Sequence, residues 1–183
     1  LNCDLIFTHN DYIAKEYQKI IKTNTMTIGS YFNNINPKVN TKKKDVIFVS
    51  QFNERKDFYF KNYKDKVITW DNYYYPEQII VPLLDEFCYR NKISLNICAR
   101  FHSNKAEKFF YESKILKANM RFMDKQEYIN SYKIIDQSKM LVFIDSTLGY
   151  ESISRHNKTV ALSVRSKFVD DESFDFGWPI NFE

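Results

Sequence analysis

Apolar and polar residues alternate along this chain in blocks whose lengths separate strands from helices. Short apolar runs between polar residues are typical of strands buried on both faces of a parallel sheet. Longer blocks with apolar positions three and four residues apart indicate helices. We therefore expect strands at 4–8, 25–28, 45–50, 93–99, 120–123, 140–144 and 159–163, and helices at 12–22, 78–90, 105–116, 126–135 and from 147 onward.

The order of these elements predicts the fold class. Strands that alternate with helices of about 10–15 residues imply strand–helix–strand units. The expected class is α/β, with a Rossmann-like, doubly wound parallel sheet. Pro76 sits where a first-turn proline would, whereas Pro82 implies a kink or a late start in the helix at 78–90. We expect the aromatic stretch before Pro76 to be irregular.

A polar, Asn-rich stretch at 31–44 divides the chain. It holds Pro37 and a lysine run, which is typical of a linker. We expect residues 1–30 to belong to one domain and residues 45–183 to another, without a shared sheet. Because the chain starts without Met inside a strand-like segment, we interpret it as part of a longer protein.

Composition restricts the possible partners and compartments. The net charge of +4, with lysines spread over the chain, is weak support for nucleic-acid binding, so we expect none. Three cysteines without a CxxC pair indicate neither a zinc site nor disulfides, which fits a reducing cytosol. No apolar run approaches the roughly 18 residues of a membrane span. We expect a cytoplasmic protein, with peripheral attachment to the inner membrane through the full-length protein left open.

One segment, 143–164, carries the clearest chemical signal. Asp145, Ser146 and Thr147 follow a buried strand at the start of a helix. Unpaired N–H groups at such a helix start can bind an anion at the carboxyl edge of a parallel sheet. The same three side chains could simply cap the helix, and spacing alone favours neither explanation.

Two further residues of this segment are candidates for ligand contact. Gly149 lets the backbone come close to a ligand. Glu151 is not spaced to close a capping box with either hydroxyl, so its carboxylate can accept a hydrogen bond from a ligand hydroxyl.

Other polar residues follow neighbouring strands. In open α/β sheets the ligand lies beyond the carboxyl ends of the strands, where the strand order reverses. Ser50 and Gln51 end one expected strand. Arg100 and His102 follow another, where they could hold a phosphate or a sugar carboxylate, although an exposed loop explains this pair equally well.

Absent motifs narrow the chemistry. The chain has no GxGxxG after the first strand, no GxxxxGK(S/T), and no GxSxG, HExxH or EF-hand pattern. Dinucleotide and P-loop chemistry are therefore not expected. There is also no DxD pair of the kind that bridges a metal to a sugar donor, so we expect neither a metal nor another cofactor.

Taken in order, several segments resemble bacterial surface-carbohydrate and capsule-biosynthesis glycosyltransferases of GT-B architecture, which include Kdo transferases. The most specific segment is Asp145-Ser-Thr-Leu-Gly-Tyr-Glu-Ser152, and the supporting ones are Ser50-Gln51-Phe52, Ala99-Arg100, Lys158-Thr-Val-Ala-Leu162 and Phe176-Gly177-Trp178-Pro179. The resemblance implies that 45–183 is a truncated C-terminal nucleotide-sugar-binding domain, one half of a GT-B fold. Residues 1–30 would be a remnant of the N-terminal, acceptor-side domain.

The resemblance also implies roles for the candidate residues. Ser146, Thr147 and the helix start would bind the donor phosphate, and Glu151 the ribose. Ser50 and Gln51 would contact the base or a phosphate. The catalytic residue normally comes from the acceptor-side domain, so none is assigned and the fragment is expected to be inactive alone. The implied donor is a nucleotide sugar, with CMP-Kdo, UDP-sugars and GDP-sugars as options, and the implied acceptor is a glycan or glycolipid.

Two other functions remain open. A sugar-phosphate-binding enzyme, such as an isomerase domain, would use the same turn but would need a general base. A non-enzymatic binding module is favoured if the aromatic stretches at 58–63 and 73–75 form an exposed patch, although filling of a core or an interface is the more ordinary explanation.

Overall fold

The computed structural model describes residues 3–40, 43–54, 59–63, 66–124 and 128–169. The chain divides into two compact units, residues 1–38 and 39–183. Each unit is described by itself.

The first unit is a strand–helix–strand segment followed by a short helix. Its elements are β1 (Leu5–Thr8), α1 (Asp11–Ile20), β2 (Asn24–Thr27) and α2 (Tyr31–Ile35). β1 and β2 pair in parallel as a sheet of their own. α2 lies within the stretch expected to be a linker, because the Ser30 hydroxyl accepts from the Asn33 N–H and so caps a helix start there.

The second unit is built on a five-stranded parallel sheet. Its strands are β3 (Lys44–Val49), β6 (Leu95–Cys98), β7 (Met120–Met123), β8 (Ser138–Phe143) and β9 (Thr159–Ala161). They lie side by side in the order β7-β6-β3-β8-β9, with every pair parallel. The chain moves outward from β3 in one direction and then returns to β8 on the other side. The strand order therefore reverses between β3 and β8, which confirms the doubly wound α/β class.

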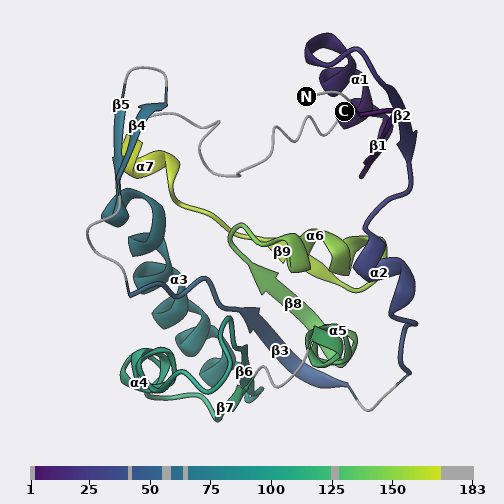
Figure 1. The fold of residues 1–183 in the computed structure, drawn as a ribbon. Coiled ribbons are helices and arrows are strands. Elements are labelled where there is room, and N and C mark those ends of the chain that lie inside the picture. Colours follow the sequence, from purple (N-terminus) through teal and green to yellow (C-terminus); the bar gives the residue numbers. More distant parts are fainter. Residues whose placement is uncertain (1–2, 41–42, 55–58, 64–65, 125–127, 170–183) are drawn as a thin grey trace. The chain divides into compact units, whose positions relative to one another are not determined.

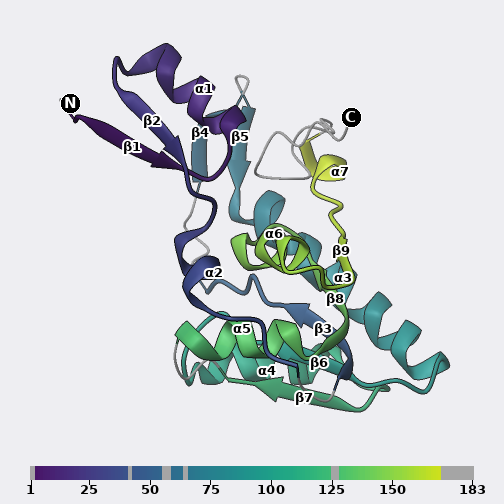
Figure 2. The same cartoon turned by 90° about the vertical axis from the view of Figure 1, so that its right-hand side faces the viewer.

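Helices cover both faces of this sheet (Figures 1 and 2). The remaining elements are the antiparallel hairpin β4 (Tyr59–Tyr63) and β5 (Lys66–Thr69), and the helices α3 (Trp70–Arg90), α4 (Lys105–Lys114), α5 (Tyr128–Asp136), α6 (Thr147–Ser154) and α7 (Ser166–Val169). α3 and α4 pack on one face, and α5 and α6 on the other.

The packing of β3 explains the continuous apolar run at 46–49. Val46 and Phe48 pack into the core beneath α3 and α4. Ile47 and Val49 pack into the separate core beneath α5 and α6. Because successive side chains of a strand point to opposite faces, a strand covered on both sides must be apolar at every position.

The start of α3 differs from the expectation. The helix begins at Trp70 and includes both Pro76 and Pro82, so the helix expected at 78–90 starts two turns earlier. A capping box explains the early start: the Thr69 N–H donates to Asn72 Oδ1 at 2.8 Å, and the Asn72 N–H donates to Thr69 Oγ1 at 3.3 Å. The stretch expected to be irregular is instead the β4–β5 hairpin and the first turns of α3.

Within the part of the chain that the structure describes, no helix combines the length and the apolar character that crossing a membrane requires.

Candidate functional site

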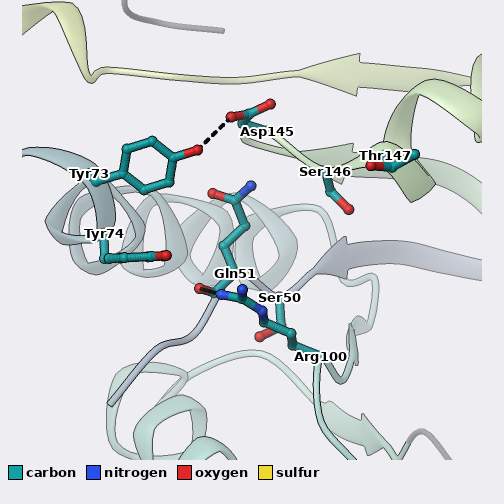
Figure 3. A pocket seen from close by; sticks show the side chains of 8 residues that line it. All are labelled: Ser50, Gln51, Tyr73, Tyr74, Arg100, Asp145, Ser146 and Thr147. Atoms are coloured by element: carbon teal, nitrogen blue, oxygen red, sulfur yellow. Dashed lines mark hydrogen bonds between the residues drawn. The ribbon is translucent and has the colours of Figure 1, made fainter. Parts of the chain in front are cut away.

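A cavity lies at the carboxyl edge of the second unit's sheet, where the strand order reverses. Its volume is about 260 Å³. Among the described residues it is lined by Ser50, Gln51, Tyr73, Tyr74, Arg100, Asp145, Ser146 and Thr147 (Figure 3). Ser50 and Gln51 follow β3, Arg100 follows β6, and the last three follow β8. The structure thus brings together five of the seven residues proposed as ligand-binding from the sequence, in the place where open α/β sheets hold their ligands.

A buried arginine organises one wall of this cavity. Arg165 has no exposed surface. Its Nη1 donates to Asp145 Oδ2 at 2.8 Å, and its Nη2 donates to Gln51 Oε1 at 2.7 Å. Its Nε donates to the Tyr73 carbonyl oxygen at 3.0 Å, and its guanidinium carbon lies 3.7 Å from the centre of the Tyr73 ring. One side chain therefore fixes the positions of three lining residues.

Asp145 belongs to this cluster and not to a helix cap. Its Oδ2 accepts from the Tyr73 hydroxyl at 3.0 Å as well as from Arg165. Burial, which is the largest cause, raises the pKa of the Tyr73 phenol, so this hydroxyl keeps its proton and donates. An aspartate held by two donors in a buried ion pair is a fixed part of the wall.

The start of α6 presents hydroxyls and N–H groups to the cavity. Ser146 is the N-cap residue in extended conformation, but its side chain makes no capping hydrogen bond. The Gly149 N–H donates to the Ser146 carbonyl at 2.8 Å, which leaves the N–H groups before it outside the helical pattern. Thr147 is exposed. Capping does not explain the Ser146 side chain, and this favours ligand contact over the alternative that the sequence left open.

Arg100 supplies the positive charge of the lining. Its Nη1 donates to the carbonyl oxygens of Gln51 and Phe52 at 3.0 and 3.2 Å, and these bonds tie the guanidinium to the loop after β3. The other N–H groups of its guanidinium make no hydrogen bond with the described residues, which leaves donors for an anion. His102, which the sequence paired with Arg100, is exposed and is not among the lining residues.

The other two predicted residues lie on α6 away from the lining. A Cβ added at Gly149 would lie 2.2 Å from Phe143 Cγ, so close packing of α6 on β8 accounts for this glycine. The close approach to a ligand that the sequence suggests for Gly149 stays a prediction. Glu151 Oε2 accepts from the Tyr132 hydroxyl at 2.9 Å. Its contact with ribose stays a prediction.

Two buried carboxylates support the loops beneath the cavity. Glu77 Oε1 accepts from the Gln51 N–H at 2.9 Å and from the Tyr111 hydroxyl. Burial raises the pKa of Glu77 to about 7, although both hydrogen bonds oppose the shift. Glu107 accepts from the N–H groups of Arg100 and Phe101 at 2.7 and 3.0 Å, and burial raises its pKa as well.

Sequence reasoning missed Arg165 and both of these acids. A signal for Glu77 was present, because it shares a helix face with Ile80 and Leu84, which are buried in the core. An acid on an apolar helix face indicates a buried carboxylate with partners. Arg165 carries no comparable signal, since its partners are Asp145 and Gln51, and Gln51 is 114 residues away in the chain.

Comparisons with known proteins identify the family of this chain. No curated protein matches it. The UDP-GlcNAc 2-epimerase from Neisseria meningitidis, solved bound to UDP-GlcNAc, is similar over 83% of this chain and 34% of its own length, with 14% identity and a TM-score of 0.43. The family model described as "putative O-antigen biosynthesis protein" matches residues 1–183. The chain belongs to this family.

Proposed function

We propose that this chain holds the nucleotide-sugar donor of a GT-B glycosyltransferase that builds a bacterial surface polysaccharide or lipopolysaccharide. The cavity at the β3–β8 reversal carries the proposal, because a cationic side chain and an uncapped helix start converge there. Membership of an O-antigen biosynthesis family supports a role in surface-carbohydrate synthesis. The resemblance of the segment 145–152 to glycosyltransferases supports the reaction class.

In this proposal the phosphates lie between α6 and Arg100. The first N–H groups of α6 and the hydroxyls of Ser146 and Thr147 donate to phosphate oxygens. The guanidinium of Arg100 adds a charged donor. As the bond between sugar and phosphate breaks, negative charge grows on the departing nucleotide, and these donors stabilise it. No metal ion enters this scheme.

A base that activates the acceptor hydroxyl would come from the acceptor-side domain of the GT-B architecture, so we name none. CMP-Kdo, UDP-sugars and GDP-sugars remain donors to be tested. The acceptor is proposed to be a glycan or glycolipid.

The lining of the cavity disfavours an isomerase. Such an enzyme needs a general base that can exchange a proton. Asp145 is the single carboxylate among the described lining residues, and it already accepts hydrogen bonds from Arg165 and from the Tyr73 hydroxyl. The binding-module alternative depended on an exposed aromatic patch. Tyr73 and Tyr74 are half-buried in the cavity wall and Tyr75 is exposed, whereas the side chains at 58–63 lie outside the described residues.

Isothermal titration calorimetry with CMP, UDP, GDP and inorganic phosphate tests the proposal. At least one nucleotide should bind, with or without EDTA. The double variant Ser146→Ala/Thr147→Ala should lose about 1–3 kcal/mol of binding free energy without losing binding, because the backbone N–H groups remain. Ser154→Ala, at the exposed far end of α6, is the matched control and should bind like the wild type. Absence of binding by all three nucleotides would refute the proposal, and a metal requirement would count against the GT-B assignment.

A further inference from the structure

A second cavity adjoins the first. Its volume is about 270 Å³, and among the described residues it is lined by Phe52, Asn53, Glu54, Trp70, Tyr74, Glu77, Gln78 and Phe110. Tyr74 lines both cavities, and Gln51 of the first is followed directly by Phe52 of the second. A ligand group that leaves the first cavity past Tyr74 therefore enters the second.

The walls of the second cavity are aromatic. The ring centres of Trp70 and Tyr74 lie 5.6 Å apart, and those of Phe52 and Phe110 lie 5.3 Å apart. Packed rings offer flat apolar faces, on which a ligand ring can stack with little loss of side-chain entropy. This lining suits a ring with an apolar face and does not suit a phosphate.

The first cavity offers donors to an anion, whereas the charged side chains that line the second cavity are acids. Glu54 and Glu77 contribute carboxyl groups to the lining. Glu54 Oε1 accepts from the side-chain amide of Asn104. Glu77 Oε1 accepts from the Gln51 N–H and from the Tyr111 hydroxyl. Neither Oε2 has a partner among the described residues. Carboxylate oxygens accept from ligand hydroxyls, whereas they repel a ligand anion. Asn53 and Gln78 also line this cavity.

Trp70 adds an unmet donor. Its Nε1 is buried and has no hydrogen-bond partner in the described part of the chain. A buried donor left unpaired costs about 1–3 kcal/mol, so such a group calls for an acceptor.

We propose that the second cavity binds the glycosyl ring of the nucleotide sugar, and that the negative charge of Glu54 makes it selective for neutral or amino sugars over sugars that carry a carboxylate, with Glu77 adding a hydrogen-bonding oxygen for a ligand hydroxyl. The inference rests on the proposed function, because the phosphates in the first cavity deliver the ring to the second. It assigns the donor's sugar class, and it disfavours Kdo, an acidic sugar.

Calorimetric titration with UDP, UDP-glucose and UDP-glucuronate tests the inference. UDP-glucose should bind at least about fivefold more tightly than UDP, the equivalent of one net hydrogen bond of about 1 kcal/mol. UDP-glucuronate, which differs by one carboxylate, should bind more weakly than UDP-glucose. Glu54→Gln should narrow this difference, and Glu112→Gln, on the exposed face of α4, should leave it unchanged.

Variants of Trp70 separate the ring site from the phosphate site. Trp70→Ala should remove the gain from glucose while UDP binds as before. Trp70→Phe keeps an aromatic ring but lacks the N–H, so it should remove part of the affinity gained from glucose. Because this variant is less disruptive, it still tests the proposal if Trp70→Ala fails to fold. Phe109→Ala is the control, since Phe109 neighbours Phe110 and is 72% exposed.

The outcomes are distinct. Binding of UDP without any gain from glucose, or equal affinity for glucose and glucuronate, overturns the inference and leaves the proposed function standing. Loss of UDP binding in Trp70→Phe also overturns it, because the residue would then serve the phosphate site. If neither UDP nor UDP-glucose binds, the inference falls together with a UDP-sugar form of the proposed function.

Discussion

Replacement of Arg165 by methionine tests how the cavity is held together. The variant keeps much of the side-chain volume and removes the charge. It leaves Asp145, whose side chain is 8% exposed, as a buried carboxylate without its cation. Removing one partner of a buried ion pair costs about 3–5 kcal/mol. The hydrogen bonds to Gln51 and to the Tyr73 carbonyl are lost as well.

Urea denaturation followed by circular dichroism measures the loss in the free energy of unfolding. Arg90→Met is the matched control, because Arg90 also pairs with an acid, Glu86, but its side chain is 73% exposed. A surface pair of this kind contributes about 0–1 kcal/mol. We expect Arg165→Met to exceed the control by at least about 2 kcal/mol, the difference between these two ranges.

A second substitution checks the cause of the loss. Adding Asp145→Asn to Arg165→Met removes the stranded charge, so part of the stability should return. Nucleotide affinity should be lower than in the wild type in both the single and the double variant, because Arg165 no longer holds Gln51 and Tyr73 in place. If Arg165→Met is no less stable than Arg90→Met, Arg165 does not organise the cavity and the account of this wall is wrong.

Three further variants probe other parts of the same unit. Gly149→Ala should lower the free energy of unfolding by about 1–3 kcal/mol, since the new Cβ meets the Phe143 ring, and wild-type stability in chemical denaturation would contradict the packing role. The pKa of Glu77 is raised from 4.5 to about 7 in the folded state, so between pH 4.5 and 7 the folded protein binds more protons at this residue than the unfolded protein does. The free energy of unfolding should therefore fall as the pH rises through this range. Glu77→Gln should flatten that pH dependence in melting curves, and an unaltered profile would argue against the shift. Glu151→Gln should weaken nucleotide binding but not phosphate binding in calorimetry, and an unchanged nucleotide affinity would contradict a role of Glu151 in ribose binding.

The parts of the fold that depend on local pattern were predictable. β7 was expected at 120–123 and is found there, and β3 was expected at 45–50 and runs over Lys44–Val49. In β3 the residues 46–49 are buried on both faces of the sheet and form a continuous apolar run, and this signal survives without knowledge of its neighbours. The start of α3 was missed because Pro76 was taken as the first turn, whereas the Thr69–Asn72 capping box set the boundary.

The candidate site divides in the same way. Ser146 and Thr147 were found because a strand, a polar turn and a helix follow one another in the sequence. Arg165 was missed because its partner Gln51 is distant in the sequence and is brought close only by the tertiary fold. Packing of α6 on β8 requires Gly149 in the structure, and the sequence could not reveal this, because a glycine needed for helix–strand contact and one needed for a ligand look alike in a sequence.

A crystal structure of the chain soaked with a nucleoside diphosphate tests the central claim most directly. The account predicts phosphate oxygens within hydrogen-bond distance of Ser146, Thr147 and the first N–H groups of α6, with the Arg100 guanidinium on the opposite side. The nucleotide should bind in this position from a solution that contains EDTA. Phosphates bound away from the β3–β8 reversal, or held only through a metal ion, would contradict the account.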